Sequence, residues 1–170
     1  TNNFVHHKLW GRIAPRVIPE MPNQLQEPMR AGLIEGLGRD LYFDGYLSNQ
    51  GLNVLVGLRG VAEATGDPVL NEWYERVINA FFDNEYRYDN HGQVPAGYYQ
   101  ERGGFDGAYN TYSAQLLIEL WRKTGEQRYY DSLVKNFELI RHLAVTVPGD
   151  KLTSARQWNT RTDSNAFRWH

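Results

Sequence analysis

The sequence contains no cysteine, and this absence excludes two kinds of site. Without thiols the chain forms no disulfide framework and binds no metal through thiolates. Long apolar runs are also missing, because no stretch approaches the ~18 apolar residues of a membrane span and no segment has the layout of a signal peptide. We therefore expect no membrane partner. The 170 residues are enough for one domain with a core of its own.

Basic residues are not in excess either, since 18 Lys and Arg stand against 20 Asp and Glu, for a formal charge of −2. A charge this close to zero gives no field that attracts nucleic acid, so we expect no nucleic-acid partner. Gly103-Gly104-x-x-Gly107 lacks a preceding strand and is no nucleotide fingerprint. The five histidines are dispersed apart from the pair His6-His7, and no H-x-x-x-H or H-E-x-x-H spacing occurs. We expect neither a cofactor nor a metal.

Aromatic residues, by contrast, make up 14% of the chain, and many of them lie in segments without a helical period. Their rings suit two roles: packing beneath long loops, or stacking against the C–H faces of sugar rings. The sequence leaves both roles open. The chain begins with Thr1 rather than Met, so we also expect a processed or excised product.

Apolar residues recur at helical spacing through most of the chain. Residues 1–22 show no such period, and Pro15, Pro19 and Pro22 predict an extended arm there. Helices are predicted over 24–37, 52–64 and 68–82 and on both sides of Thr124 up to residue 143, with Pro28 in the first turn of the first helix. We therefore expect three parts: an arm (1–22), a helical domain (23–146) and an irregular tail (147–170).

Two helix pairs follow one pattern, in which Thr124-Gly125-Glu126 repeats Thr65-Gly66-Asp67 after 59 residues (124 − 65). In each pair the first helix is apolar on more than one face, which predicts burial, and the second is apolar on one face only. Gly66 suits the left-handed position that ends a helix, Asp67 the N-cap of the next and Pro68 its first turn. The residues predicted to face inward in the second pair include Ile118, Trp121, Tyr130, Val134 and Phe137. The pattern predicts an all-α fold of αα-hairpin repeats with long aromatic-rich loops.

The turn between an apolar and an amphipathic helix resembles that of the (α/α) toroid of carbohydrate-active enzymes. This group includes polysaccharide lyases of the heparinase and alginate lyase type and unsaturated glucuronyl hydrolases. The resemblance covers roughly residues 44–143, and it implies that the loops leading into the apolar helices line a substrate cleft. In this sequence those loops are 43–51 and 98–113. A closed toroid needs more hairpins than this chain has, so we expect a homo-oligomer or the rest of a larger chain to cover its exposed apolar faces.

Elimination beside a uronate needs three groups: one neutralises the carboxylate, a base removes the α-proton and an acid protonates the leaving oxygen. Lyases of this toroid type are described with Asn or Gln, Tyr, His and Arg in these roles. The candidates here are Asn110 and Asn49 as neutralising groups, Tyr109 and Tyr112 as base or acid, His91 as base, and Arg102 as the carboxylate ligand. Each has a structural alternative. Tyr109 and Tyr112 suit packing at a helix start, Asn110 suits an N-cap, and His91 suits a solvated loop.

Hydrolysis needs two carboxyl groups ~5–10 Å apart across the glycosidic bond. Glu101 and Asp106 flank a glycine pair, and Asp44 precedes the earlier hairpin at the equivalent place. The alternative is that Asp106 and Asp44 cap turns and Glu101 pairs with an arginine. The residues predicted to bind substrate are Asp44, Tyr46, Asn49, Gln50, Tyr99, Arg102, Phe105 and Trp158.

Together these patterns favour a carbohydrate-active enzyme, or a fragment of one, that acts on an acidic polysaccharide, and a lyase over a hydrolase. Such an enzyme is expected to be extracellular or periplasmic. The alternative is a non-catalytic helical-repeat protein for glycan binding or self-assembly.

Overall fold

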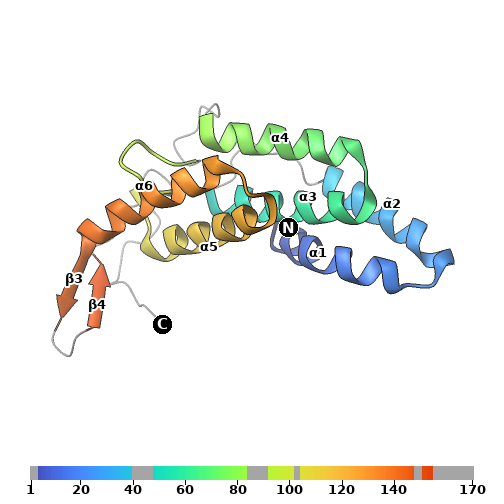
Figure 1. Cartoon of the computed structure of the whole chain (residues 1–170), viewed down its shortest axis with the longest axis horizontal. Helices are drawn as coiled ribbons and strands as arrows, with labels where there is room; N and C mark the ends of the chain where they lie inside the picture. The colour runs from blue at the N-terminus through green and yellow to red at the C-terminus, as the bar shows by residue number, and fades with distance from the viewer. Residues whose placement is uncertain (1–3, 40–47, 84–91, 102–103, 148–150, 155–170) are drawn as a thin grey trace. The chain divides into compact units, whose positions relative to one another are not determined.

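The computed structural model describes residues 4–39, 48–83, 92–101, 104–147 and 151–154 (Figure 1). Its helices are α1 (Phe4–Val17), the 3-10 helix η1 (Ile18–Glu20), α2 (Asn23–Arg39), α3 (Ser48–Thr65), α4 (Pro68–Asp83), α5 (Gly107–Thr124) and α6 (Gln127–Leu143). Its strands are β1 (Gln100–Glu101), β2 (Gly104–Phe105), β3 (Ala144–Val147) and β4 (Lys151–Ser154). Strands β1 and β2 form one antiparallel pair, and β3 and β4 form another. The described residues are therefore mostly helical, as the all-α prediction requires.

The extended arm predicted for residues 1–22 is wrong over most of that range, because α1 and η1 occupy residues 4–20. Pro15 lies inside α1, but it removes only one backbone bond close to the end of the helix. Packing supplies the missing stability, since Ala14 and Ile18 are buried at 2% and 1% exposure. Pro28 likewise lies within α2 instead of in its first turn. The irregular tail is wrong at 151–154, where backbone pairing with β3 forms β4.

The chain divides into two compact units, which we describe separately. Unit 1 contains residues 1–44 and 50–80, and so holds α1, α2 and most of α3 and α4. Unit 2 contains residues 45–49 and 81–170, and so holds the first two residues of α3, the end of α4, and α5 and α6 with their loops.

Unit 1 is organised around α3, whose apolar residues are buried on every side, as predicted. Helix α1 crosses it at three glycines, where the two backbones touch. A Cβ on Gly60 would overlap Gly11 O, and a Cβ on Gly57 would lie 2.7 Å from His7 O. Only residues without a side chain allow this approach. The fully buried residues of α3 are Leu52, Val54, Leu55, Val56, Leu58 and Val61.

The turn between α3 and α4 has the predicted chemistry. Gly66 has a φ of 70°, in the left-handed region, and its N–H donates to Ala62 O. Thr65 Oγ1 donates to Val61 O at 2.8 Å and accepts from the N–H of Asp67 at 3.2 Å. Asp67 then caps α4, because its Oδ1 accepts from the N–H of the second helical residue at 2.8 Å.

The turn between α5 and α6 repeats the hydrogen bonds of the glycine and the threonine. Gly125 has a φ of 70° and donates its N–H to Trp121 O. Thr124 Oγ1 donates to Leu120 O at 2.9 Å and accepts from the N–H of Glu126 at 3.2 Å. The two turns therefore end α3 and α5 in the same way, through a threonine hydroxyl and a left-handed glycine at the same relative positions.

Helices α5 and α6 run side by side in unit 2 (Figure 1), but α6 does not bury the face that was predicted. Its buried residues are Tyr129, Ser132 and Asn136. Of the residues predicted on the apolar face, Tyr130, Val134 and Phe137 are exposed, Phe137 at 64%, and Leu133, Ile140 and Leu143 are half-buried. The same correction applies to α5, where Trp121 is 38% exposed. The polar side of α6 is buried because it exchanges hydrogen bonds with the loop over 92–101. Asn136 Nδ2 donates to Gly97 O of the loop, and Gln93 Nε2 of the loop donates to Ser132 O of α6.

Candidate functional site

The first residues of α3 are hydrogen-bonded to strand β1 within unit 2. Ser48 Oγ lies 3.1 Å from Gly92 O and 2.9 Å from Gln100 O, the two carbonyls to which its hydroxyl can donate. Asn49 Nδ2 donates to Glu101 Oε1. Ser48 and Asn49 are both buried, at 0% and 3% exposure. The start of this apolar helix is therefore tied to the loop that leads into α5.

The first turn of α5 is tied to the same loop. Asn110 Oδ1 accepts from the backbone N–H of Tyr99 at 3.0 Å and from Asn136 Nδ2 at 2.9 Å. Asn136 Nδ2 also lies 2.9 Å from Gly97 O. Over the residues described, the amide of Asn49 thus joins the two predicted cleft loops, and the amides of Asn110 and Asn136 hold the second of them against α5 and α6. Asn110 is the fourth residue of its helix, so the N-cap alternative for it is wrong.

Asp106 is the residue that caps α5. Its Oδ1 accepts from the N–H of Tyr109 at 3.1 Å, and its backbone is extended, as an N-cap requires. This hydrogen bond confirms the capping alternative for Asp106, which is also buried, at 2% exposure. Asp106 is therefore committed to the helix start.

Glu101 is fully buried, with 0% exposure, and its carboxylate accepts the hydrogen bond from Asn49. A buried carboxyl group is unfavourable unless polar neighbours satisfy it. The amide of Asn49 meets part of that requirement and fixes the direction in which the carboxyl group points. Arg102, the arginine next to Glu101 in the sequence, lies outside the described residues.

Tyr99 and Phe105, which were predicted to stack against sugar rings, are both fully buried. The Tyr99 ring lies 6.1 Å from that of Phe81, and its hydroxyl lies 3.2 Å from Ser132 Oγ. Burial raises the pKa of the Tyr99 phenol above its usual range, and the hydrogen bond with Ser132 acts in the opposite direction. Neither ring offers a face to solvent, so both residues pack beneath the loop. This is the other role that the sequence left open.

Tyr109 and Tyr112 are the candidate residues of α5 that keep partial exposure. They are three positions apart, and residues at this spacing lie on one side of a helix with Cβ atoms ~5–6 Å apart. Ser113 follows them and is buried, and its hydroxyl has no hydrogen-bond partner among the described residues. Gln50 on α3 is half-buried. The start of α5 therefore presents two phenol groups on one face.

The remaining predicted site residues lie outside the described part of the chain: Asp44, Tyr46, His91, Arg102 and Trp158. Within that part, no three or more His, Asp or Glu side chains are close enough together to hold a metal ion. None of the helices in the described ranges has the length and apolar character needed to cross a membrane.

Three residues whose side chains join the hydrogen bonds around the loop over 92–101 were not predicted from the sequence: Gln93, Ser132 and Asn136. Gln93 Nε2 donates to Gly97 O at 2.8 Å and to Ser132 O at 2.9 Å, which fastens the loop to α6. A signal for two of them existed. Ser132 and Asn136 are four residues apart on a predicted helix, so these small polar side chains share one face.

A comparison of this chain with protein-family models, with curated proteins and with solved structures found no match.

Proposed function

We propose that this chain is part of a carbohydrate-active enzyme of the (α/α) toroid type, that its substrate is an acidic polysaccharide, and that it cleaves by elimination. Two features support the architecture. The turns after α3 and α5 share their hydrogen bonds, and the loops leading into these two helices meet around β1. Each hairpin would then be one repeat, with its loop end directed toward the substrate.

The observation that favours elimination is the difference in exposure between phenols and carboxyl groups. Hydrolysis requires two carboxyl groups that reach the glycosidic bond. Glu101 and Asp106 are 0% and 2% exposed, and Asp106 is used as a helix cap. Tyr109 and Tyr112 keep partial exposure on one side of α5. A sugar at the start of α5 would therefore meet hydroxyl groups before it met a carboxylate.

In this proposal one phenol removes the α-proton of the uronate and the other protonates the leaving oxygen. The electron pair of the broken C–H bond forms the new C=C bond, and the C–O bond to the leaving sugar breaks, so no water is consumed. Asn49 and Asn110 are engaged by Glu101 and Tyr99, so they serve as positioning residues. The group that neutralises the substrate carboxylate then falls to His91 or Arg102.

The experiment is an absorbance assay with a panel of uronate polysaccharides, read at the band of the unsaturated product. Tyr109→Phe and Tyr112→Phe are each expected to lower the rate ~10²–10⁴-fold, the usual contribution of a positioned acid or base. Tyr130→Phe is the matched control, because it removes one hydroxyl from an exposed tyrosine of α6. New reducing ends without absorbance would mean hydrolysis, and unchanged rates in both α5 variants would remove the phenols from the mechanism.

A second candidate function is self-assembly without catalysis. It is favoured by the apolar surface of unit 2, where the rings of Trp121 and Tyr130 lie 5.7 Å apart and Phe137 is 64% exposed. Patches of this kind mark interfaces. Under this alternative the assay is silent with every substrate, and light scattering shows an oligomer that Phe137→Ser dissociates. A monomer that produces the unsaturated product would argue against it.

A further inference from the structure

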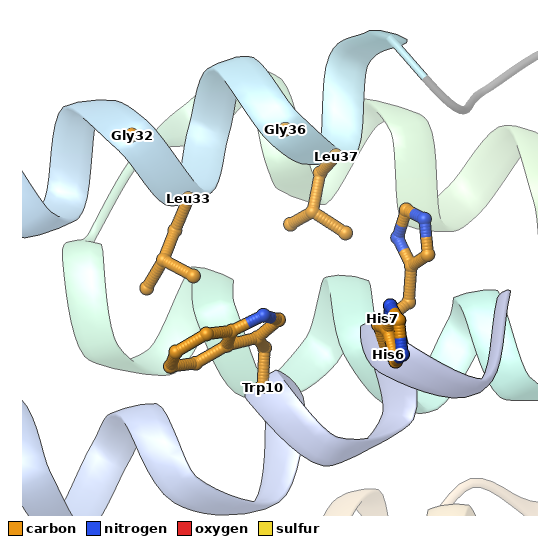
Figure 2. Close-up of a pocket in the computed structure, with 7 residues that line it drawn as sticks. All are labelled: His6, His7, Trp10, Gly32, Leu33, Gly36 and Leu37. Carbon is orange, nitrogen blue, oxygen red and sulfur yellow. The ribbon is translucent and has the colours of Figure 1, made fainter. Parts of the chain in front are cut away.

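Unit 1 contains a cavity of about 180 Å³ between α1 and α2, and no residue of the site proposed above contributes to it. Figure 2 shows it with α1 on one side and α2 on the other. Its lining consists of His6, His7, Trp10, Gly32, Leu33, Gly36 and Leu37.

The α2 wall of the cavity contains two glycines for which no packing reason exists. Gly32 and Gly36 are four residues apart on one face, and apart from the adjoining backbone of α2 no atom of the described residues lies within 4 Å of the place where either Cβ would be. This distinguishes them from Gly11 and Gly60, whose missing side chains allow two helices to touch. Glycine destabilises a helix interior relative to alanine. Here it leaves bare backbone beside an open space, where a ligand can approach closely.

The opposite wall supplies an aromatic face and polar groups. Figure 2 shows the indole of Trp10 across the cavity from Leu33 and Leu37, with His7 at one end. Trp10 is 43% exposed, so its ring is accessible. His6 and His7 add imidazole nitrogens, each of which can donate or accept a hydrogen bond. The lining therefore combines an apolar face with polar groups at the side.

The cavity has room for one ring. Pockets that enclose drug-sized molecules measure ~300–1,000 Å³, and this cavity has about 180 Å³. A pyranose fits both size and lining, because its C–H face complements an indole and its hydroxyl edge pairs with imidazole nitrogens. We propose that this cavity is a carbohydrate subsite that binds one sugar ring between Trp10 and the α2 wall. The choice of a sugar rests on the proposed function, but the cavity is separate from the start of α5.

The test is a titration of the full chain with glucuronate, and with glucose as the uncharged sugar, following the Trp10 indole N–H by NMR. We expect both sugars to shift this resonance. Trp10→Ala should weaken the binding measured by calorimetry at least tenfold, because it removes the stacking face. Trp121→Ala is the matched control, since Trp121 is exposed to a similar extent, at 38%, on α5. It should leave the affinity unchanged.

A second variant, Gly32→Ala/Gly36→Ala, narrows the cavity from its α2 wall without removing any existing contact. Both methyl groups have room, so this variant folds, and it should also lose at least tenfold in affinity. Sugar binding that survives in the double variant, or a Trp10 resonance that neither sugar moves, overturns the proposal. The proposal is also overturned if phenol shifts the Trp10 resonance and neither sugar does, because the pocket would then suit an apolar side chain. Binding by a chain with no elimination activity supports the subsite and contradicts only the lyase proposal.

Discussion

Replacing Gly60 by alanine is expected to destabilise unit 1, because α1 and α3 touch through their backbones at this residue. The new Cβ would overlap Gly11 O. That oxygen belongs to a helix backbone, which cannot rotate away as a side chain does. The clash is relieved only if α1 moves away from α3 along the crossing, which also loosens the packing of Ala14 and Ile18.

Two opposing effects set the magnitude. Alanine favours a helix interior over glycine by about 1 kcal/mol. Forcing one more carbon into a packed contact costs about 1–3 kcal/mol, and partial exposure of Ile18 adds to this, because fully burying such a side chain contributes about 1.5–3 kcal/mol. The clash therefore wins, and we expect Gly60→Ala to lower the free energy of unfolding by about 2 kcal/mol.

The measurement is urea denaturation followed by circular dichroism, where a change of this size lowers the midpoint by about 1 M for a typical slope. Gly36→Ala is the control, because it makes the same substitution in a helix with no atom within 4 Å of the new Cβ. It should stabilise the chain by about 0.5–1 kcal/mol. If Gly60→Ala stabilises the chain as much as Gly36→Ala does, the close crossing of α1 and α3 is wrong.

Two further predictions concern Asn110 and Tyr99, two buried residues of unit 2. Asn110→Ala removes Asn110 Oδ1, which accepts from the Tyr99 N–H and from the Asn136 amide. It should lower the free energy of unfolding by about 1–3 kcal/mol in the same denaturation assay. An unchanged midpoint would contradict these hydrogen bonds. The raised pKa keeps Tyr99 protonated in the folded chain, whereas an unfolded tyrosine ionises near pH ~10. The contribution of Tyr99 to the free energy of unfolding is therefore complete below pH ~10 and declines above it, because ionisation then favours the unfolded chain. Tyr99→Phe should therefore lose less stability than wild type between pH ~9 and ~11, and equal losses would refute the assignment.

The helix ends were predictable because the groups involved are neighbours in the sequence. Thr65 and Asp67 cap their helices through bonds that span four residues or fewer, and Gly66 supplies the one left-handed conformation that the turn needs. The same local chemistry predicts the turn at Thr124. Nothing elsewhere in the chain has to be known for these predictions to hold.

The helical N-terminus was not predictable in this way. Its prolines indicate an extended chain, but α1 forms because Gly11 meets Gly60 and Ile18 is buried, and these contacts join parts of the sequence that are far apart. The orientation of α6 has a similar cause. Its pattern favours an apolar inner face, but the polar side is buried because Asn136 donates to Gly97 O of the loop over 92–101 and Gln93 of that loop donates to Ser132 O.

The candidate site also has a part that the sequence predicted and a part that depends on the tertiary structure. The sequence by itself predicted an apolar helix over 52–64 and another before Thr124, and it selected Asn49, Glu101 and Asn110 as candidate site residues. The structure begins these helices earlier, at Ser48 and Gly107. Only the tertiary structure decided that Asn49 and Glu101, 52 residues apart, share a hydrogen bond in a buried place, while Tyr109 and Tyr112 keep partial exposure. The physical reason is that capping and helical periodicity act over a few residues, whereas burial depends on every segment that packs against a side chain.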